Sequence, residues 1–149
     1  MKVLFIYPNH KGMNMLPPAI GLLSACLKRD GHIVQLFDTT HYNSVKIGET
    51  VDETDSDKSK SDRLMAKPYI NPKEITLKYS NVFEDFKNTV DSFSPDLLAL
   101  STTEDMFHLG LSLLKSLKGQ RPLTIAGGVF PTFAPELVLS FDEIDIVCK

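Results

Sequence analysis

The residues best suited to chemistry follow two apolar runs in the second half of the sequence. Ser101-Thr102-Thr103 follows the run 97–100, and Gly127-Gly128 follows the run 123–126. Hydroxyl groups donate and accept hydrogen bonds, and glycine lets a ligand or another backbone approach closely. Together the two motifs favour a flat floor for a large planar or heterocyclic group. Each motif alone also has a structural explanation, because glycines begin turns and hydroxyls cap helices.

The loop after the first apolar run, Asn9-His10-Lys11-Gly12, lacks the features of several familiar sites. The sequence contains neither the G-x-G-x-x-G spacing of a dinucleotide site nor the G-x-x-x-x-G-K-[ST] pattern of a P-loop. The loop also carries no carboxylate to hold the magnesium ion of a phospho-receiver. Because no G-x-S-x-G elbow occurs either, an independent α/β enzyme using Ser101 or a thiol is the weakest function class.

Alternating apolar runs and amphipathic stretches predict the elements that position these motifs. Strands are expected at Lys2–Tyr7, His32–Phe37, Leu97–Leu100, Leu123–Ala126 and Ile144–Cys148. Helices are expected from Pro17-Pro18 to just before Gly31, and at Asn81–Phe93, Met106–Leu117 and Pro135–Ser140. Such alternation predicts an α/β, flavodoxin-like (Rossmann-like) three-layer sandwich around a five-stranded parallel sheet. The expected strand order is 2-1-3-4-5, in which the loops after strands one, three and four meet at the ligand-binding edge.

The segment from His41 to about Lys78 interrupts this alternation. Its centre, VDETDSDKSKSDR, is charged and rich in serine, and such a segment cannot bury enough apolar surface to offset its chain entropy. We therefore expect a flexible insertion after the second strand. Its second half contains residues that are expected to dock onto the domain, namely Pro68, Tyr69, Ile70, Pro72, Ile75 and Leu77.

The bulk properties indicate one ordinary domain spanning residues 1–149. The chain is 42% hydrophobic with a net charge of −3, which gives no reason to expect a nucleic-acid or an anionic-membrane partner. No stretch is long enough to span a bilayer, and we expect a cytoplasmic protein. Cys26 and Cys148, far apart in the sequence, are expected to be reduced core thiols.

Three segments resemble the N-terminal cobalamin-binding domain of cobalamin-dependent radical S-adenosylmethionine enzymes. They are LPPAIGLLSACLKRDGHIVQLFDTT, SPDLLALSTT and LTIAGGVFPTFAPELVL, and the resemblance covers nearly the whole chain except the insertion. It implies that Ser101 and Thr103 hydrogen-bond the dimethylbenzimidazole tail of cobalamin, held base-off. The cofactor-binding residues implied by the resemblance are Asn9, His10, Ser101, Thr102, Thr103, Gly127, Gly128, Val129, Phe130 and Pro131.

The resemblance also assigns places to the other residues of this set. Gly127-Gly128 would leave room for the tail, and Asn9-His10 would lie near the lower face of the corrin. The segment Val129-Phe130-Pro131 would line the cavity. Enzymes that ligate cobalt through the protein carry Asp-x-His-x-x-Gly after the first strand, whereas this chain has Pro8-Asn9-His10-Lys11-Gly12. The lower cobalt ligand is therefore left open. It could be His10 or no protein residue at all, and we favour His10 being a loop histidine that does not ligate cobalt.

The chain lacks the Cys-x-x-x-Cys-x-x-Cys run that holds an iron–sulfur cluster in this family. S-adenosylmethionine and the 4Fe–4S cluster would therefore belong to a covalently following radical domain, expected to be absent from this chain together with a C-terminal helix. By this resemblance the chain is a binding module without a catalytic residue of its own. The alternative is a degenerate structural or docking domain of the same fold that no longer binds cobalamin.

Overall fold

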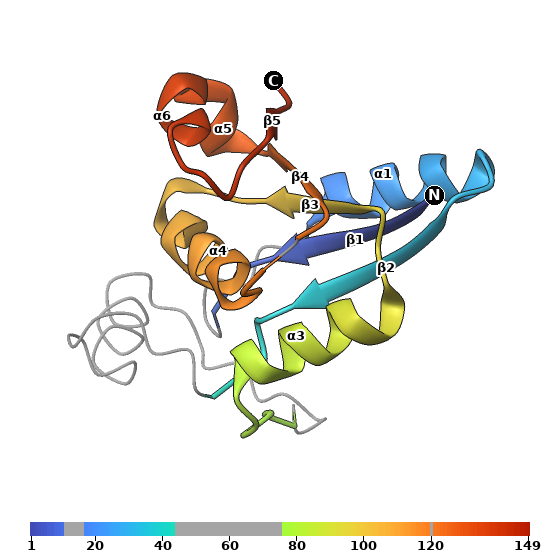
Figure 1. Cartoon of the computed structure of the whole chain (residues 1–149). Coiled ribbons are helices and arrows are strands. Elements are labelled where there is room, and N and C mark those ends of the chain that lie inside the picture. The colour runs from blue at the N-terminus through green and yellow to red at the C-terminus, as the bar shows by residue number, and fades with distance from the viewer. Residues whose placement is uncertain (11–16, 44–75, 120) are drawn as a thin grey trace, which may run out of the picture.

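The computed structural model describes residues 1–10, 17–43, 76–119 and 121–149, and these form a five-stranded parallel sheet with helices packed around it (Figure 1). The strands are β1 (Lys2–Tyr7), β2 (Ile33–Asp38), β3 (Leu97–Ser101), β4 (Leu123–Gly127) and β5 (Ile146–Val147). The helices are α1 (Pro18–Arg29), α3 (Val82–Phe93), α4 (Glu104–Ser116), α5 (Val129–Phe133) and α6 (Pro135–Leu139). The strand order β2-β1-β3-β4-β5 confirms the predicted flavodoxin-like α/β fold.

Alternate side chains of the strands build two separate apolar layers. On one side of the sheet, which we call the α1 face, Val3, Phe5 and Ala99 pack with Ile20 of α1. On the opposite side, the α4 face, Leu4 and Leu98 pack into the larger core. Because successive residues of a strand point to opposite faces, uninterrupted apolar runs are what a sheet covered on both sides requires.

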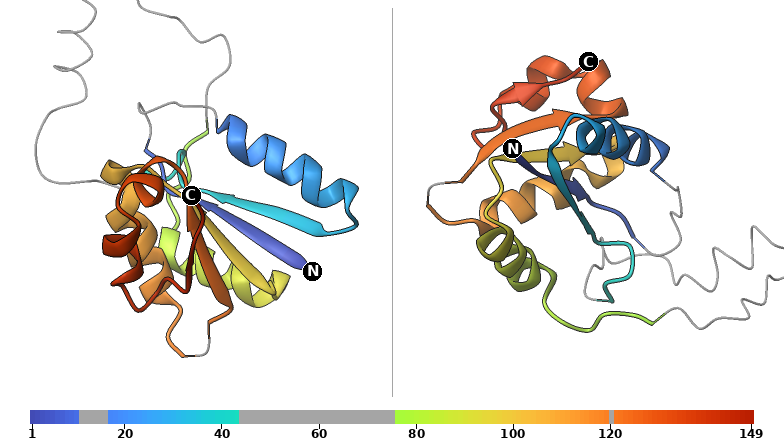
Figure 2. Two further views of the ribbon diagram at one scale, coloured as in Figure 1. Left: turned by 90° about the horizontal axis from the view of Figure 1, so that it is seen from above. Right: turned by 90° about the vertical axis from the view of Figure 1, so that its right-hand side faces the viewer.

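The two faces are covered unequally. The larger core of the α4 face includes residues of α3, α4 and α6, such as Phe86, Leu114 and Val138. Among the described helices, α1 alone packs on the other face, and it lies on the β2 side of the sheet (Figure 2). Leu123 and Ile146 on β4 and β5 are consequently 51% and 41% exposed.

Local signals explain where the helices begin and end. Pro18 occupies the first turn of α1, where its missing N–H is not needed. The Asn81 side chain accepts a hydrogen bond from the backbone N–H of Phe83 at 2.9 Å and so caps α3. That helix ends at Ser94, which has a left-handed φ of 48°, and Pro95 follows. None of the described helices has the length and apolar character needed to cross a membrane.

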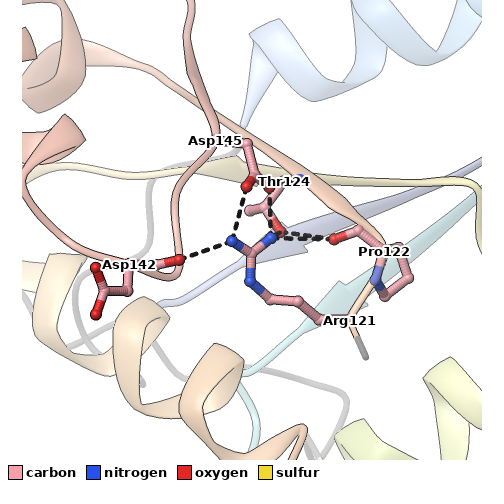
Figure 3. Close-up of polar contacts among 5 residues, drawn as sticks. All are labelled: Arg121, Pro122, Thr124, Asp142 and Asp145. Carbon is pink, nitrogen blue, oxygen red and sulfur yellow. Dashed lines mark hydrogen bonds and ion pairs between the residues drawn. The ribbon is translucent and has the colours of Figure 1, made fainter. Parts of the chain in front are cut away.

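A guanidinium clamp holds the short strand β5 against β4 at the amino end of the sheet (Figure 3). Arg121 forms an ion pair with Asp145 that uses both carboxylate oxygens, and it also donates to the carbonyl oxygen of Asp142 at 2.7 Å. The backbone N–H of Thr124 donates to Asp145 at 2.7 Å. Since β5 has two residues, these contacts add substantially to its short ladder with β4.

Most of the predicted insertion, residues 44–75, lies outside the described residues, and so do Pro68, Tyr69, Ile70, Pro72 and Ile75, which were expected to dock. The two flanks of this segment meet, because Asn43 donates to the carbonyl of Lys78 and Lys78 donates to the carbonyl of His41, both at 2.8 Å. Tyr42 is buried in the core beside Phe37, with ring centroids 5.9 Å apart. The folded domain therefore extends past the predicted start of the insertion at His41.

Candidate functional site

The carboxyl ends of β3 and β4 bring the hydroxyl and glycine motifs together. Ser101 and Gly127 are register partners, and the N–H of Thr102 continues the ladder by donating to the carbonyl of Gly127 at 3.1 Å. Parallel strands place their carboxyl ends at one edge of a sheet, where open α/β folds bind ligands. The hydroxyl and glycine motifs therefore lie next to each other, as predicted.

Ser101 and Gly127 lie on the less covered α1 face. Each follows by two positions a residue of that face, Ala99 on β3 and Ile125 on β4, and side chains two apart share a face. Ser101, Ile125 and Gly127 are half-buried. The four residues Ala99, Ser101, Ile125 and Gly127, which we call the β3–β4 floor, have three small members and one apolar one.

Gly127 leaves room at this floor for a small group. A Cβ at this position would meet the Cβ of Cys148 at 3.8 Å, an ordinary van der Waals distance. Cys148 is an exposed free thiol and Cys26 is half-buried, so the prediction that both are core residues is wrong. Cys148 lies at the β5 side of the floor. The Arg121 clamp holds β5 in place at the other end of that strand.

Gly128 and Thr102 serve the packing of the protein's own backbone. Gly128 has a φ of 106°, and a Cβ there would lie 2.6 Å from the carbonyl oxygen of Thr102. Thr102 is buried, and its hydroxyl donates to the carbonyl of Thr103 at 2.8 Å. These two residues fix the edge of the site, and they do not present side-chain groups to the floor.

Thr103 occupies the N-cap position of α4 with an extended backbone and an exposed side chain. Within the described residues its hydroxyl makes no capping hydrogen bond, although capping was one explanation for the hydroxyl motif. The first turn of α4 carries Glu104 and Asp105, whose negative charges favour a helix N-terminus. Thr103 therefore adds a hydroxyl to the rim of the site.

The segment Val129-Phe130-Pro131, expected to line a cavity, forms most of the short helix α5, which the sequence did not predict. Phe130 packs against Phe107 of the larger core, with ring centroids 5.0 Å apart, and Pro131 is buried. Val129 is 61% exposed. Phe130 thus belongs to the α4 face, on the other side of the sheet from the β3–β4 floor.

Asn9 joins a buried polar network between the ends of β1 and β2. Its backbone N–H donates to the hydroxyl of Thr39 at 2.8 Å, and that hydroxyl donates back to the Asn9 carbonyl at 2.7 Å. Its side-chain amide donates to the hydroxyl of Thr40 at 3.0 Å, and Thr40 in turn donates to Asp38. This network could not be predicted from the sequence, because Thr39 and Thr40 resemble ordinary residues at the end of a strand.

His10 follows directly after this network and is half-buried, and the next described residue is Pro17. Among the described residues, no group of three or more His, Cys, Asp and Glu side chains lies close enough to hold a metal ion. A scan against protein-family models found no match, and a search of the curated proteins found none either.

Proposed function

We propose that this domain binds cobalamin, with the nucleotide tail of the cofactor against the β3–β4 floor. The observation that supports the proposal is the pairing of Ser101 with Gly127 on the incompletely covered α1 face. The benzimidazole of the nucleotide tail is flat and largely apolar, and its one ring nitrogen that is not bonded to the ribose accepts a hydrogen bond. A floor of small residues beside a hydroxyl fits such a group.

The chain's own residues would divide the work of binding. Ser101 would donate a hydrogen bond to the tail, and Gly127 with Ala99 would leave the space that its ring needs. Thr103 would add a second hydroxyl at the rim. Asn9, held by Thr39 and Thr40, would fix the loop that carries His10 towards the corrin. Gly128, Thr102, Phe130 and Pro131 would act indirectly, by shaping the edge of the site.

When bound, cobalamin supplies the chemistry of a cobalt-centred group carrier, while the protein supplies binding and orientation. We propose that the module serves a covalently attached radical domain that binds S-adenosylmethionine and an iron–sulfur cluster. In this arrangement the domain described here would act as the holder of the cofactor.

A second function has support from the same face of the sheet. Leu123 and Ile146 leave apolar surface exposed beside the floor, and an apolar sheet face is suited to packing against another domain. The domain would then be a docking module of the same fold that binds no cofactor. The two proposals differ in what they require of Gly127, because docking through Leu123 and Ile146 does not depend on space at the floor.

Equilibrium dialysis against hydroxocobalamin, followed by the visible spectrum of the retained cofactor, tests the proposal. The wild-type domain is expected to retain the cofactor, and Gly127→Leu is expected to weaken binding by roughly tenfold or more because the side chain fills the floor. Lys115→Leu introduces the same side chain at an exposed position on α4, on the other side of the sheet, and is expected to bind normally. Circular dichroism establishes that each variant is folded. No retention by the wild type would favour the docking module, whereas equal binding by Gly127→Leu would place the cofactor away from the β3–β4 floor and overturn the proposed site.

A further inference from the structure

A groove of about 400 Å³ runs between the outer edge of β2 and the polar side of α3. It lies at the opposite margin of the sheet from β4 and β5, and it shares no lining residue with the β3–β4 floor. Leu36 and Asp38 of β2 line it on one side, and Asn88, Thr89 and Ser92 of α3 line it on the other. The groove therefore combines a strand edge with a row of uncharged hydrogen-bonding side chains.

The outer edge of β2 carries backbone groups with nothing to pair with in the described part of the chain. The N–H of Ile33 donates to the carbonyl of Met1 at 3.0 Å, and the N–H of Thr39 donates to the carbonyl of Tyr7 at 3.2 Å. Residues two apart in a strand direct their backbone groups to the same side, so the intervening Val34 and Leu36 direct theirs away from β1. Their donors and acceptors point out of the sheet along the groove.

Among the described residues, β2 itself carries little of the usual protection against strand pairing. Exposed edge strands are commonly blunted by lysine, proline or a bulge. The sequence of β2, IVQLFD, contains no lysine or proline, and its register with β1 is continuous over all six residues. Two of its apolar side chains, Ile33 and Leu36, are 57% and 42% exposed. Such an edge favours the addition of another strand.

The carboxyl end of the groove is closed by side chains that satisfy one another. The Tyr42 hydroxyl donates to Asp85 at 2.9 Å, Ser80 donates to the same carboxylate at 2.6 Å, and the Lys78 ammonium lies 4.8 Å from the centre of the Tyr42 ring. Asp38 accepts hydrogen bonds from Thr40. Because these charges are engaged within the domain, the groove favours an uncharged occupant.

We propose that the β2 edge binds an extended segment of a partner protein as an additional strand. Main-chain hydrogen bonds to Val34 and Leu36 would supply affinity, as in other cases of strand addition. Side chains of the added strand would alternate between two environments. Those on the α3 side would be polar and uncharged, to match Asn88 and Ser92, and those on the α1 side would be apolar, to cover Leu36. A segment of about six residues would match the length of β2.

Selection of a random dodecapeptide library on the purified domain, followed by nuclear magnetic resonance titration with a selected synthetic peptide, tests this proposal. We expect selected peptides to alternate apolar and uncharged polar residues, and the amide resonances of Val34 and Leu36 to shift. Leu36→Pro removes one outward N–H at an edge position that tolerates proline, and it is expected to weaken binding by roughly tenfold or more. Leu36→Val keeps the N–H and serves as the matched control.

Asn88→Leu provides a second variant that leaves the backbone of β2 intact, and circular dichroism shows whether each variant is folded. This change is expected to weaken binding of peptides that carry polar residues on the α3 side. The proposal would be overturned by a selection that enriches no peptide, by resonance shifts confined to other surfaces, or by equal binding of the Leu36→Pro and Leu36→Val variants. Dimerisation of the domain through β2 would overturn it as well, because a second copy would then occupy the edge.

Discussion

The carbonyl oxygen of Thr102 and Gly128 approach so closely that no side chain fits between them. A Cβ on residue 128 would stand 2.6 Å from that oxygen and 3.0 Å from the Thr102 nitrogen, and the φ of Gly128 is 106°. The neighbouring Gly127 has no such constraint, since its Cβ would make an ordinary contact. The two glycines of one motif therefore have different roles, one in the fold and one in the space at the β3–β4 floor.

Exchanging each glycine for alanine separates these roles. Gly128→Ala is expected to lower the free energy of unfolding by about 2–4 kcal/mol, because it combines a disfavoured φ with a backbone clash. Gly127→Ala is expected to change it by less than about 1 kcal/mol. Urea denaturation followed by circular dichroism measures both. Equal effects of the two changes would contradict the division of roles.

The strands and their order could be predicted because apolar runs and intervening helices leave few topologies for a parallel sheet. The face of the sheet on which a loop residue packs could not be predicted in this way. Phe130 lies two residues after Gly128, whose φ is positive, and its ring packs against Phe107 on the α4 face. A sequence motif shows that a glycine is present, but it does not show its φ.

Contacts between residues distant in the sequence were also beyond prediction. Arg121 and Asp145 are charged residues in loops, and their pairing depends on β4 and β5 starting side by side. Tyr42 appeared to belong to the insertion, although its ring packs beside Phe37. Of the candidate site, the neighbourhood of Ser101 and Gly127 followed from the strand order, whereas the attachment of Asn9 to Thr39 depends on the path of the chain beyond β1 and β2.

Thr39 links the ends of β1 and β2 through one fully buried hydroxyl. Thr39→Val keeps the shape of the side chain but leaves the N–H and carbonyl of Asn9 without this partner. We expect a loss of about 1–3 kcal/mol in the free energy of unfolding. Thr39→Ser keeps the hydroxyl and is expected to lose about 1 kcal/mol or less, the contribution of one methyl group. Urea denaturation of the two variants decides the matter, and equal losses would assign the effect to packing.

Tyr42 is expected to make stability depend on alkaline pH. Burial, followed by the hydrogen bond to Asp85, raises the pKa of Tyr42 above its ordinary value. The folded state therefore holds the phenolic proton more tightly than the unfolded state, whose tyrosines ionise near pH 10. The contribution of this proton to stability is complete below about pH 10 and declines as the pH rises further.

Tyr42→Phe isolates that contribution. The variant loses the hydrogen bond to Asp85, and we expect it to be less stable than the wild type by about 0.5–1.5 kcal/mol at neutral pH. The difference should shrink above about pH 10, because the wild type alone loses the benefit of the retained proton. Denaturation curves at a series of pH values provide the measurement. A difference that stays constant through the alkaline range would show that the phenol does not titrate differently in the two states.

The Arg121 clamp is expected to determine how the free energy of unfolding decreases at acidic pH. The hydrogen bond from Arg121 lowers the pKa of Asp145, with a further contribution from the Thr124 N–H, against an opposing effect of burial. A carboxyl group whose pKa is lower in the folded state stabilises the fold above its unfolded pKa, near 4, and this stabilisation is lost as the pH falls through the folded value.

Asp145→Asn is therefore expected to lower the free energy of unfolding by about 1–2 kcal/mol at neutral pH, since the ion pair is partly exposed. The difference in the free energy of unfolding between this variant and the wild type should become smaller below about pH 4. Arg121→Lys keeps the positive charge without the two-pronged geometry, so its stability should lie between those of the wild type and Asp145→Asn. A pH-independent difference between Asp145→Asn and the wild type would show that the carboxylate charge does not hold β5 in place.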